Sequence, residues 1–226
     1  PAVSSPFPGR IMHLLSLKLV PDPLYSMDKL IDLSDKIEKE TIKISVPEGK
    51  HALYALVKIS GFMQVINGAP GATGPVLDHY NKTAVKNYLG NMSDAIEKRI
   101  GPLSGNIRSL FTDSMELEGS NWSAGIMDEF QKRRGYDLFP YLPFVLFKTG
   151  AMGNVTDFKY GVTMSPEFEG MIMRMRYDFE LTKAELLSER FIKTYVEWCR
   201  GLKVKSRAQA YGRGFFPLES SFDYDI

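Results

Sequence analysis

Apolar and alternating runs in the N-terminal part of the chain predict a small antiparallel β region. Residues 11–20 are apolar enough for a buried strand, which the sequence Pro21-Asp22-Pro23 ends. Residues 41–46 alternate between polar and apolar, and a tight turn connects them to a second strand-like run at residues 51–59. Two such runs around one tight turn predict a β-hairpin. We therefore expect antiparallel β structure over residues 11–66.

Apolar residues at three- and four-residue spacing predict helices over residues 82–99, 124–134 and 166–200. Asn81 is a suitable N-cap for the first of these helices, and Ser123 for the second. Lys132, Arg133 and Arg134 fall in the last turn of the second helix, where cations suit the helix dipole. The basic triplet is therefore interpreted as a helix end rather than as a nucleic-acid patch.

The second part of the chain has the order strand, helix, strand. Residues 106–111 alternate as a short strand with one buried face does, and residues 204–210 predict a further strand after the long helix. This order is typical of a parallel sheet or barrel built from βα units. We therefore expect residues 67–226 to form an α/β region distinct from the N-terminal β region.

Carboxylates gather where the strand at residues 106–111 ends. Asp113, Glu116 and Glu118 follow that strand, and Trp122 comes close behind them. In β/α folds, sites lie at the carboxyl ends of the strands because the loops there converge on one mouth. An aromatic face beside carboxylates suits a sugar ring, so this stretch is a candidate carbohydrate site. The alternative, that these acids are solvated turn residues, stays open at this point.

A second candidate element lies at the entry of the first helix, where Asp78-His79-Tyr80 precedes Asn81. Such a cluster could contact a ligand. It could equally serve to cap the helix and to pack against it. The sequence alone leaves both possibilities open.

Composition excludes several classes of function. The chain has 226 residues, of which 44% are hydrophobic and 24% charged, as in ordinary globular proteins. Lys and Arg number 28 against 27 Asp and Glu, so no field of one sign indicates nucleic acid as a partner. No apolar run approaches the roughly 20 residues of a membrane span. Cys199, the single cysteine, excludes an internal disulfide and a cysteine-ligated zinc site, and we expect it to be a small core residue.

The central motifs resemble glycoside hydrolase family 106, the α-L-rhamnosidases. The stretches that carry the resemblance are Asp113-Ser114-Met115-Glu116, Asn121-Trp122-Ser123, Glu129-Phe130, Arg133-Arg134-Gly135-Tyr136-Asp137 and Pro140-Tyr141-Leu142-Pro143. Stretches similar to those of the family also occur on both sides, at Pro47-Glu48-Gly49-Lys50, Asp78-His79-Tyr80 and Arg207-Ala208-Gln209-Ala210-Tyr211-Gly212. The resemblance covers most of residues 40–226.

The resemblance implies a fold and a mechanism. It implies an α/β fold, a partial (β/α)8 TIM-type barrel over residues 67–226 with the antiparallel β region in front of it. It also implies an inverting mechanism, with Glu116 as general acid and Asp113 holding the sugar or a calcium ion, or tuning the pKa of Glu116. The water-activating base is expected from a later glutamate beyond Ile226. Residues expected to contact the substrate are Trp122, His79, Tyr211 and Ser114.

The expected substrates are rhamnose-containing plant polysaccharides or glycosides, and the expected cofactor is calcium, with unknown ligands. The alternative is a non-catalytic carbohydrate-binding fragment or a degenerate homologue. Residues 1–10 are expected to be a linker or lead-in, and a start at Pro1 rather than Met indicates sequence upstream. The partners expected are therefore a carbohydrate and the remainder of the parent polypeptide, with neither nucleic acid nor membrane. The family implies a bacterial protein that is periplasmic or secreted, and the isolated 226-residue chain is expected to be inactive.

Overall fold

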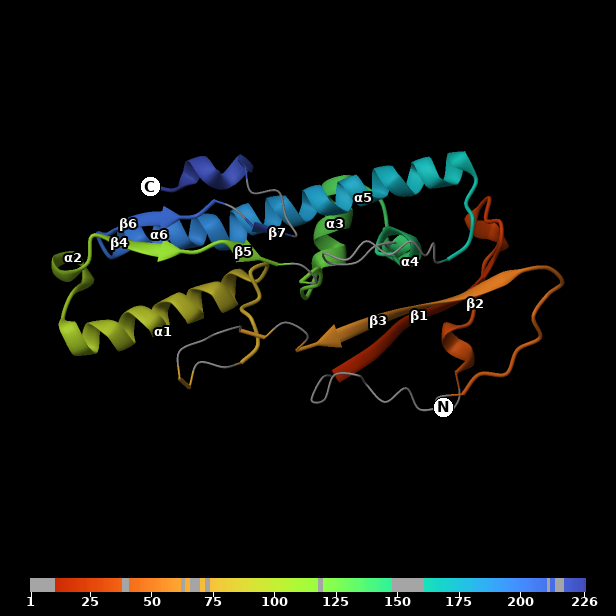
Figure 1. Ribbon diagram of the computed structural model, residues 1–226, viewed down its shortest axis with the longest axis horizontal. Helices are drawn as coiled ribbons and strands as arrows, with labels where there is room; N and C mark the ends of the chain where they lie inside the picture. The colour runs from red at the N-terminus through yellow and green to blue at the C-terminus, as the bar shows by residue number, and fades with distance from the viewer. Residues whose placement is uncertain are drawn as a thin grey trace. The chain divides into compact units, whose positions relative to one another are not determined.

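The computed structural model describes residues 11–37, 41–61, 64–65, 70–71, 74–117, 120–147, 161–210, 212–213 and 218–226. The chain divides into two compact units. The first comprises Pro1–Phe62 with Arg134–Asp178, and the second comprises Met63–Arg133 with Phe179–Ile226. The elements of both units are labelled in Figure 1.

An antiparallel sheet of three strands forms the N-terminal part of the first unit. It consists of β1 (Ile11–Pro21), β2 (Ile31–Asp32) and β3 (His51–Ser60) in the order β2-β1-β3. The long strands β1 and β3 run side by side in Figure 1, with a register irregularity between Leu14 and Ser16. The prediction of antiparallel β structure in this part of the chain is thus confirmed.

The predicted hairpin between residues 41–46 and 51–59 is wrong. In the described structure, β3 pairs with β1, and residues 42–50 contain no strand. β3 has a longer partner in β1, because the 11 residues of β1 and the 10 residues of β3 run side by side from Pro21↔His51 to Ile11↔Ser60. The apolar side chains of the 41–46 segment are buried in another way, since Ile42 and Ile44 pack in part against the cluster formed by Leu17, Leu19 and Leu33.

Aromatic packing joins the rest of the first unit to this sheet. The Tyr54 ring on β3 lies 5.2 Å from the Phe144 ring of α4 (Leu142–Val145), and the Tyr54 hydroxyl accepts a hydrogen bond from the Val162 amide at 3.0 Å. Gly161 is required beside this contact. Its φ is +86°, and a Cβ there would lie 2.3 Å from the Tyr54 hydroxyl.

In the second unit, α1 (Lys82–Ile100) confirms the first predicted helix and its caps. The Asn81 side chain accepts hydrogen bonds from the Thr83 and Ala84 amides, each at 3.1 Å. Gly101 ends the helix with φ at +79°. A single turn, α2 (Leu103–Asn106), then leads to the central strands.

The second predicted helix is α3 (Ile126–Arg134), which begins later than expected. Ser123 does not cap it through its side chain, because its hydroxyl donates to Asp78 instead, at 2.7 Å. At the start of the helix, the Ser123 backbone carbonyl accepts a hydrogen bond from the Ile126 amide at 3.3 Å. Gly135 follows the helix with φ at +83°, the left-handed conformation that is common just past a helix end.

The predicted long helix is present but contains a change of geometry. It consists of α5 (Pro166–Leu187), the π turn η4 (Ser188–Ile192) and α6 (Lys193–Gly201), which follow one another without a break. Cys199 is fully buried on α6 as a free thiol, and burial raises its pKa to about 11. No helix of the described residues is long and apolar enough to cross a membrane.

Two parallel strand pairs complete the second unit. They are β4 (Ser109–Thr112) with β6 (Lys205–Ala208), and β5 (Met115–Glu116) with β7 (Gly212–Arg213). The predicted strand, helix and strand order therefore gives parallel pairing, and α6 contacts both β6 and α1. Short 3-10 turns occur at η1 (Met27–Lys29), η2 (Ser34–Lys36), η3 (Phe139–Tyr141) and η5 (Leu218–Asp223). The fold is mixed α/β with an N-terminal antiparallel sheet, and its described strands form no closed barrel.

Candidate functional site

The acidic stretch of the sequence lies where β4 ends. Asp113 directly follows β4, and its side chain is exposed, with Oδ1 accepting a hydrogen bond from the Ser114 amide at 2.8 Å. The chain turns here and enters β5, whose second residue is Glu116. The structure describes the backbone of Glu116 but not its side chain. Asp113 and the backbone of Glu116 therefore lie after the carboxyl end of a parallel strand.

Parallel pairing places a second motif beside this turn. Thr112 is in register with Ala208, and the Gln209 amide donates to the Thr112 carbonyl at 3.1 Å. Further along, Glu116 is in register with Arg213. Two stretches about a hundred residues apart thus meet at their strand ends, as the carboxyl ends of neighbouring parallel strands do. Tyr211, which belongs to the second stretch, lies outside the described residues.

Asp78 joins two other predicted elements. Its Oδ2 accepts from the Ser123 hydroxyl at 2.7 Å, and its Oδ1 accepts from the Tyr80 amide at 3.0 Å. The segment around His79 is thereby tied to the segment that holds Trp122, whose side chain is half-buried. Because both carboxylate oxygens accept hydrogen bonds from the chain, Asp78 orients the two segments.

His79 itself is half-buried, and its ring meets the Phe191 ring edge-on at a centroid distance of 4.7 Å. Burial lowers the pKa of His79, while a hydrogen bond with the Leu77 backbone and the charge of Asp78 oppose that change. The imidazole is therefore neutral at pH 7 and offers one donor and one acceptor nitrogen. Such a ring can hydrogen-bond a hydroxyl group, although no hydrogen bond or ion pair among the described residues connects it to Asp113.

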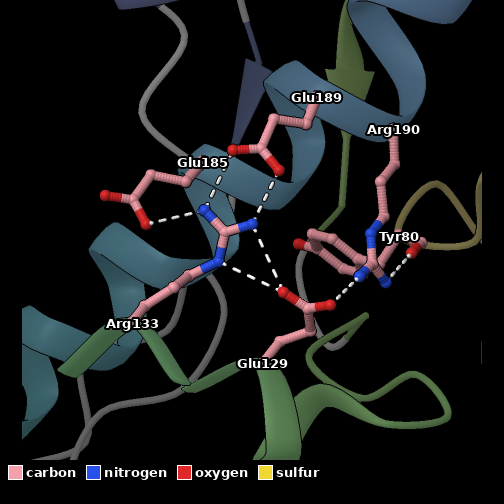
Figure 2. Close-up of polar contacts among 6 residues, drawn as sticks. All are labelled: Tyr80, Glu129, Arg133, Glu185, Glu189 and Arg190. Carbon is pink, nitrogen blue, oxygen red and sulfur yellow. Dashed lines mark hydrogen bonds and ion pairs between the residues drawn. The ribbon is translucent and has the colours of Figure 1, made fainter. Parts of the chain in front are cut away.

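A network of charged side chains lies beside the His79 segment, and Figure 2 shows it. The Arg133 guanidinium lies between Glu189, bound through two hydrogen bonds of 2.9 and 2.6 Å, and Glu185 and Glu129, each at 3.3 Å. Arg190 donates to Glu129 at 2.6 Å and to the Tyr80 carbonyl at 2.9 Å. Three helical segments and the loop before α1 are thus joined by charge-assisted hydrogen bonds.

Sequence reasoning missed this network, because it assigned Arg133 only to a helix end. One local signal was available. Glu129 and Arg133 stand four residues apart on α3, and Glu185 and Glu189 stand four residues apart on the long helix, so each pair shares one helix face. Nothing local indicates Arg190, whose partners lie 61 and 110 positions away along the chain.

A calcium site finds no support among the described side chains. Among the residues that the structure describes, no group of three or more His, Cys, Asp and Glu gathers where a metal ion could be held. Calcium prefers six to eight oxygen ligands, of which Asp113 would supply at most two. The calcium ion implied by the sequence resemblance stays a prediction.

Comparison with known proteins places these features in a family. The α-L-rhamnosidase family profile matches residues 16–213. A solved rhamnosidase from Novosphingobium sp. PP1Y is similar in structure, with a TM-score of 0.55 and 27% identity over 80% of this chain and 16% of that one. A curated protein of Formosa agariphila, provisionally named a β-glucuronidase, is 24% identical over 96% of this chain and 18% of its own length.

The chain therefore spans less than a fifth of the length of these two relatives. The family match includes the acidic turn after β4, the Asp78–Ser123 connection and the strand pair formed by β5 and β7. It covers most of the chain, and the parallel strand register brings together stretches that the sequence resemblance had marked separately. The chain belongs to glycoside hydrolase family 106, the α-L-rhamnosidases.

Proposed function

We propose that this chain is part of the catalytic region of an inverting α-L-rhamnosidase that acts on rhamnose-containing plant polysaccharides or glycosides. The observation that carries the proposal is the exposed acidic turn at Asp113, at the carboxyl end of β4 and beside the end of the parallel strand β6. Sites of β/α enzymes lie at such strand ends. On this proposal, the two parallel pairs are part of a (β/α)8 barrel.

In this mechanism Glu116 is the general acid. An inverting glycosidase uses two carboxyl groups roughly 6.5–9.5 Å apart, one to protonate the leaving oxygen and one to activate water on the opposite face of the sugar. Glu116 would deliver its proton to the glycosidic oxygen as the bond to the anomeric carbon breaks. Asp113, three residues earlier, would raise the pKa of Glu116 by like-charge repulsion or hold the sugar.

The water-activating base is proposed to lie outside these 226 residues. The chain corresponds to less than a fifth of the length of these relatives, so the proposal assigns the base to the longer protein. We propose that the isolated chain does not turn over substrate and that the remainder of a longer polypeptide completes the site. Export to the periplasm or the medium of a bacterium and a bound calcium ion remain further proposals, supported by family membership alone.

The sugar itself would be held by residues near the acidic turn. Aromatic faces and neutral hydrogen-bonding groups suit a deoxy sugar, which carries both an apolar face and hydroxyl groups. The residues proposed to supply these contacts are Trp122, His79, Ser114 and Tyr211. Support for His79 and Trp122 comes from the Asp78–Ser123 hydrogen bond, which holds their segments together.

The test compares Glu116→Gln with the wild type in the complete polypeptide that carries this chain. The substrates are aryl α-L-rhamnosides whose leaving groups differ in pKa. General acid catalysis is worth about 10²–10⁴-fold, and it matters most for poor leaving groups. We expect turnover of such substrates to fall by that factor while turnover of activated ones falls much less. An equal loss across all leaving groups would remove Glu116 from the acid role.

A second candidate function is non-catalytic carbohydrate binding. The half-buried Trp122 and the neutral His79 support carbohydrate binding and hydrolysis equally, since each residue would only contact the sugar. The two functions separate when wild-type complete polypeptide is incubated with aryl α-L-rhamnosides. Saturable binding without any product would support the binding protein and exclude the hydrolase.

A further inference from the structure

The π turn η4 interrupts an otherwise regular helix of the second unit, and π turns are frequent at functional sites. An α-helix rotates about 100° per residue, so three consecutive side chains would spread over about 200° of its surface. A π turn contains one more residue, which reduces the rotation per residue. Three successive side chains, those of Glu189, Arg190 and Phe191, each find a partner beside or within the loop that precedes α1.

These three contacts form a set. Glu189 binds Arg133 through both carboxylate oxygens, which anchors the π turn to α3. Arg190 binds the Tyr80 carbonyl, and the Phe191 ring contacts the ring of His79. One side chain thus attaches the turn to a neighbouring helix, while the next two hold consecutive residues of the predicted sugar-contacting loop. Figure 2 shows the first two of the three contacts.

The Arg190 contact has a geometry that another cation cannot reproduce. Its Nη1 donates to the Tyr80 carbonyl at 2.9 Å while its Nη2 donates to Glu129 at 2.6 Å, and the side chain is 23% exposed. A guanidinium makes both bonds from one rigid plane, whereas a lysine ammonium is a single point on a flexible stem. The bond to Tyr80 fixes the backbone between His79 and the N-cap Asn81.

We propose that Arg190 is a positioning residue for sugar binding. It holds the backbone beside His79 and, through the Asp78–Ser123 hydrogen bond, the segment that carries Trp122. Phe191 fixes the plane of the imidazole in the same arrangement. The π turn is therefore the device that orients this side of the binding site. The effect on sugar binding rests on the proposed function. That Arg190 holds the loop before α1 can be tested without it.

The test uses Arg190→Lys in the complete polypeptide, with Lys132→Arg as the matched control. Both changes keep the charge, but Lys132 is an exposed residue of α3 outside the three contacts, whereas Arg190 contacts the loop before α1. A hydrogen bond to a charged group contributes about 1.5–3 kcal/mol, which corresponds to about 10- to 150-fold in an equilibrium. We expect Arg190→Lys to raise KM for an aryl α-L-rhamnoside by about tenfold or more, with kcat changed less than about threefold. Lys132→Arg should leave KM within about twofold.

A second measurement does not depend on activity. The amides of Tyr80, Thr83 and Ala84 donate to side chains of the same loop, so their hydrogen exchange reports its order. We expect Arg190→Lys to accelerate exchange in this segment and Lys132→Arg to leave it unchanged. If wild-type protein hydrolyses no rhamnoside, the proposed function fails, and the exchange result still decides whether Arg190 holds the loop.

Two results would overturn the inference. One is unchanged exchange in residues 79–84 of Arg190→Lys. The other is an equal rise in KM for both variants, which would show a general loss of stability rather than positioning. Should Arg190→Lys fail to fold, Phe191→Leu takes its place, because it removes the ring contact with His79 while keeping an apolar side chain. The same rise in KM is expected for it, and an unchanged KM would refute the role of the π turn.

Discussion

Replacing Arg133 by methionine should loosen the helices of the second unit that it connects. The change keeps a long side chain but removes every charge-assisted hydrogen bond that the guanidinium makes. Glu185 and Glu189 then lose their bonds to Arg133, while Glu129 keeps its bond to Arg190. The substitution itself should cost little packing, since methionine fills irregular space well.

The magnitude follows from the exposure of the groups. The Arg133 side chain is 20% exposed, and that of Glu189 is 46% exposed. An exposed ion pair contributes about 0–1 kcal/mol, whereas breaking a buried pair by removing one partner is destabilising by about 3–5 kcal/mol. The network lies between these limits, so we expect a loss of about 2–3 kcal/mol in local stability. That loss corresponds to an open state that is populated about 30- to 150-fold more.

Amide hydrogen exchange measures this opening segment by segment, without requiring two-state unfolding of a large protein. Peptides from α3 and from η4 should lose protection by the stated factor in Arg133→Met. Lys132→Met is the matched control, because Lys132 is an exposed residue on the same helix, and such changes rarely exceed about 0.5 kcal/mol. Equal protection in the two variants would refute the estimate. It would show that the network makes no net contribution to local stability.

The pH dependence of this effect has a definite sign. Arg133 lowers the pKa of Glu189, so the folded state binds a proton there less readily than the unfolded state. The stabilisation is therefore complete above the ordinary glutamate pKa of about 4.3 and is lost as the pH falls through the lower folded value. The difference between wild type and Arg133→Met should accordingly be largest near neutral pH and shrink in acid. A difference that grows below pH 4 would contradict the assignment.

Three further predictions concern single side chains. Cys199 should resist iodoacetamide at pH 8 in the native protein and react once urea unfolds it, as mass spectrometry would show, because burial raises its pKa to about 11. Trp122→Ala should raise KM for aryl α-L-rhamnosides, and unchanged affinity and turnover would exclude a site role. The lowered pKa of His79 means that acid favours the unfolded form. The thermal midpoint should therefore fall as the pH drops below about 6.5, and less so in His79→Gln.

The helices could be predicted from the sequence because their signals are local. Asn81 and Gly101 mark the ends of α1, and the apolar spacing between them requires no knowledge of the rest of the chain. The parallel pairing of β4 with β6 could also be predicted, since a strand followed by a helix and another strand can adopt few arrangements. The acidic turn at Asp113 then follows from the position of the strand end.

Strand partners were harder to predict because pairing is not local. The alternation in residues 41–46 is real, and Ile42 and Ile44 are in fact partly buried. What the pattern cannot show is which partner the next strand takes. β3 pairs with the more distant strand β1 along its length, and the same isoleucines pack against the cluster of Leu17, Leu19 and Leu33 without forming a strand.

The charge network shows a different limit. A chain with 28 basic and 27 acidic residues allows many pairings, and apart from the local Glu129–Arg133 pair, Arg133 and Arg190 bind partners 52 to 110 positions away. The π turn makes the problem harder, because it shifts every later side chain relative to the regular 3.6-residue spacing on which helix predictions depend. Yet this shift serves the contacts with Arg133, Tyr80 and His79. A π turn at the place where a helix contacts predicted site residues therefore indicates a functional constraint in addition to core packing.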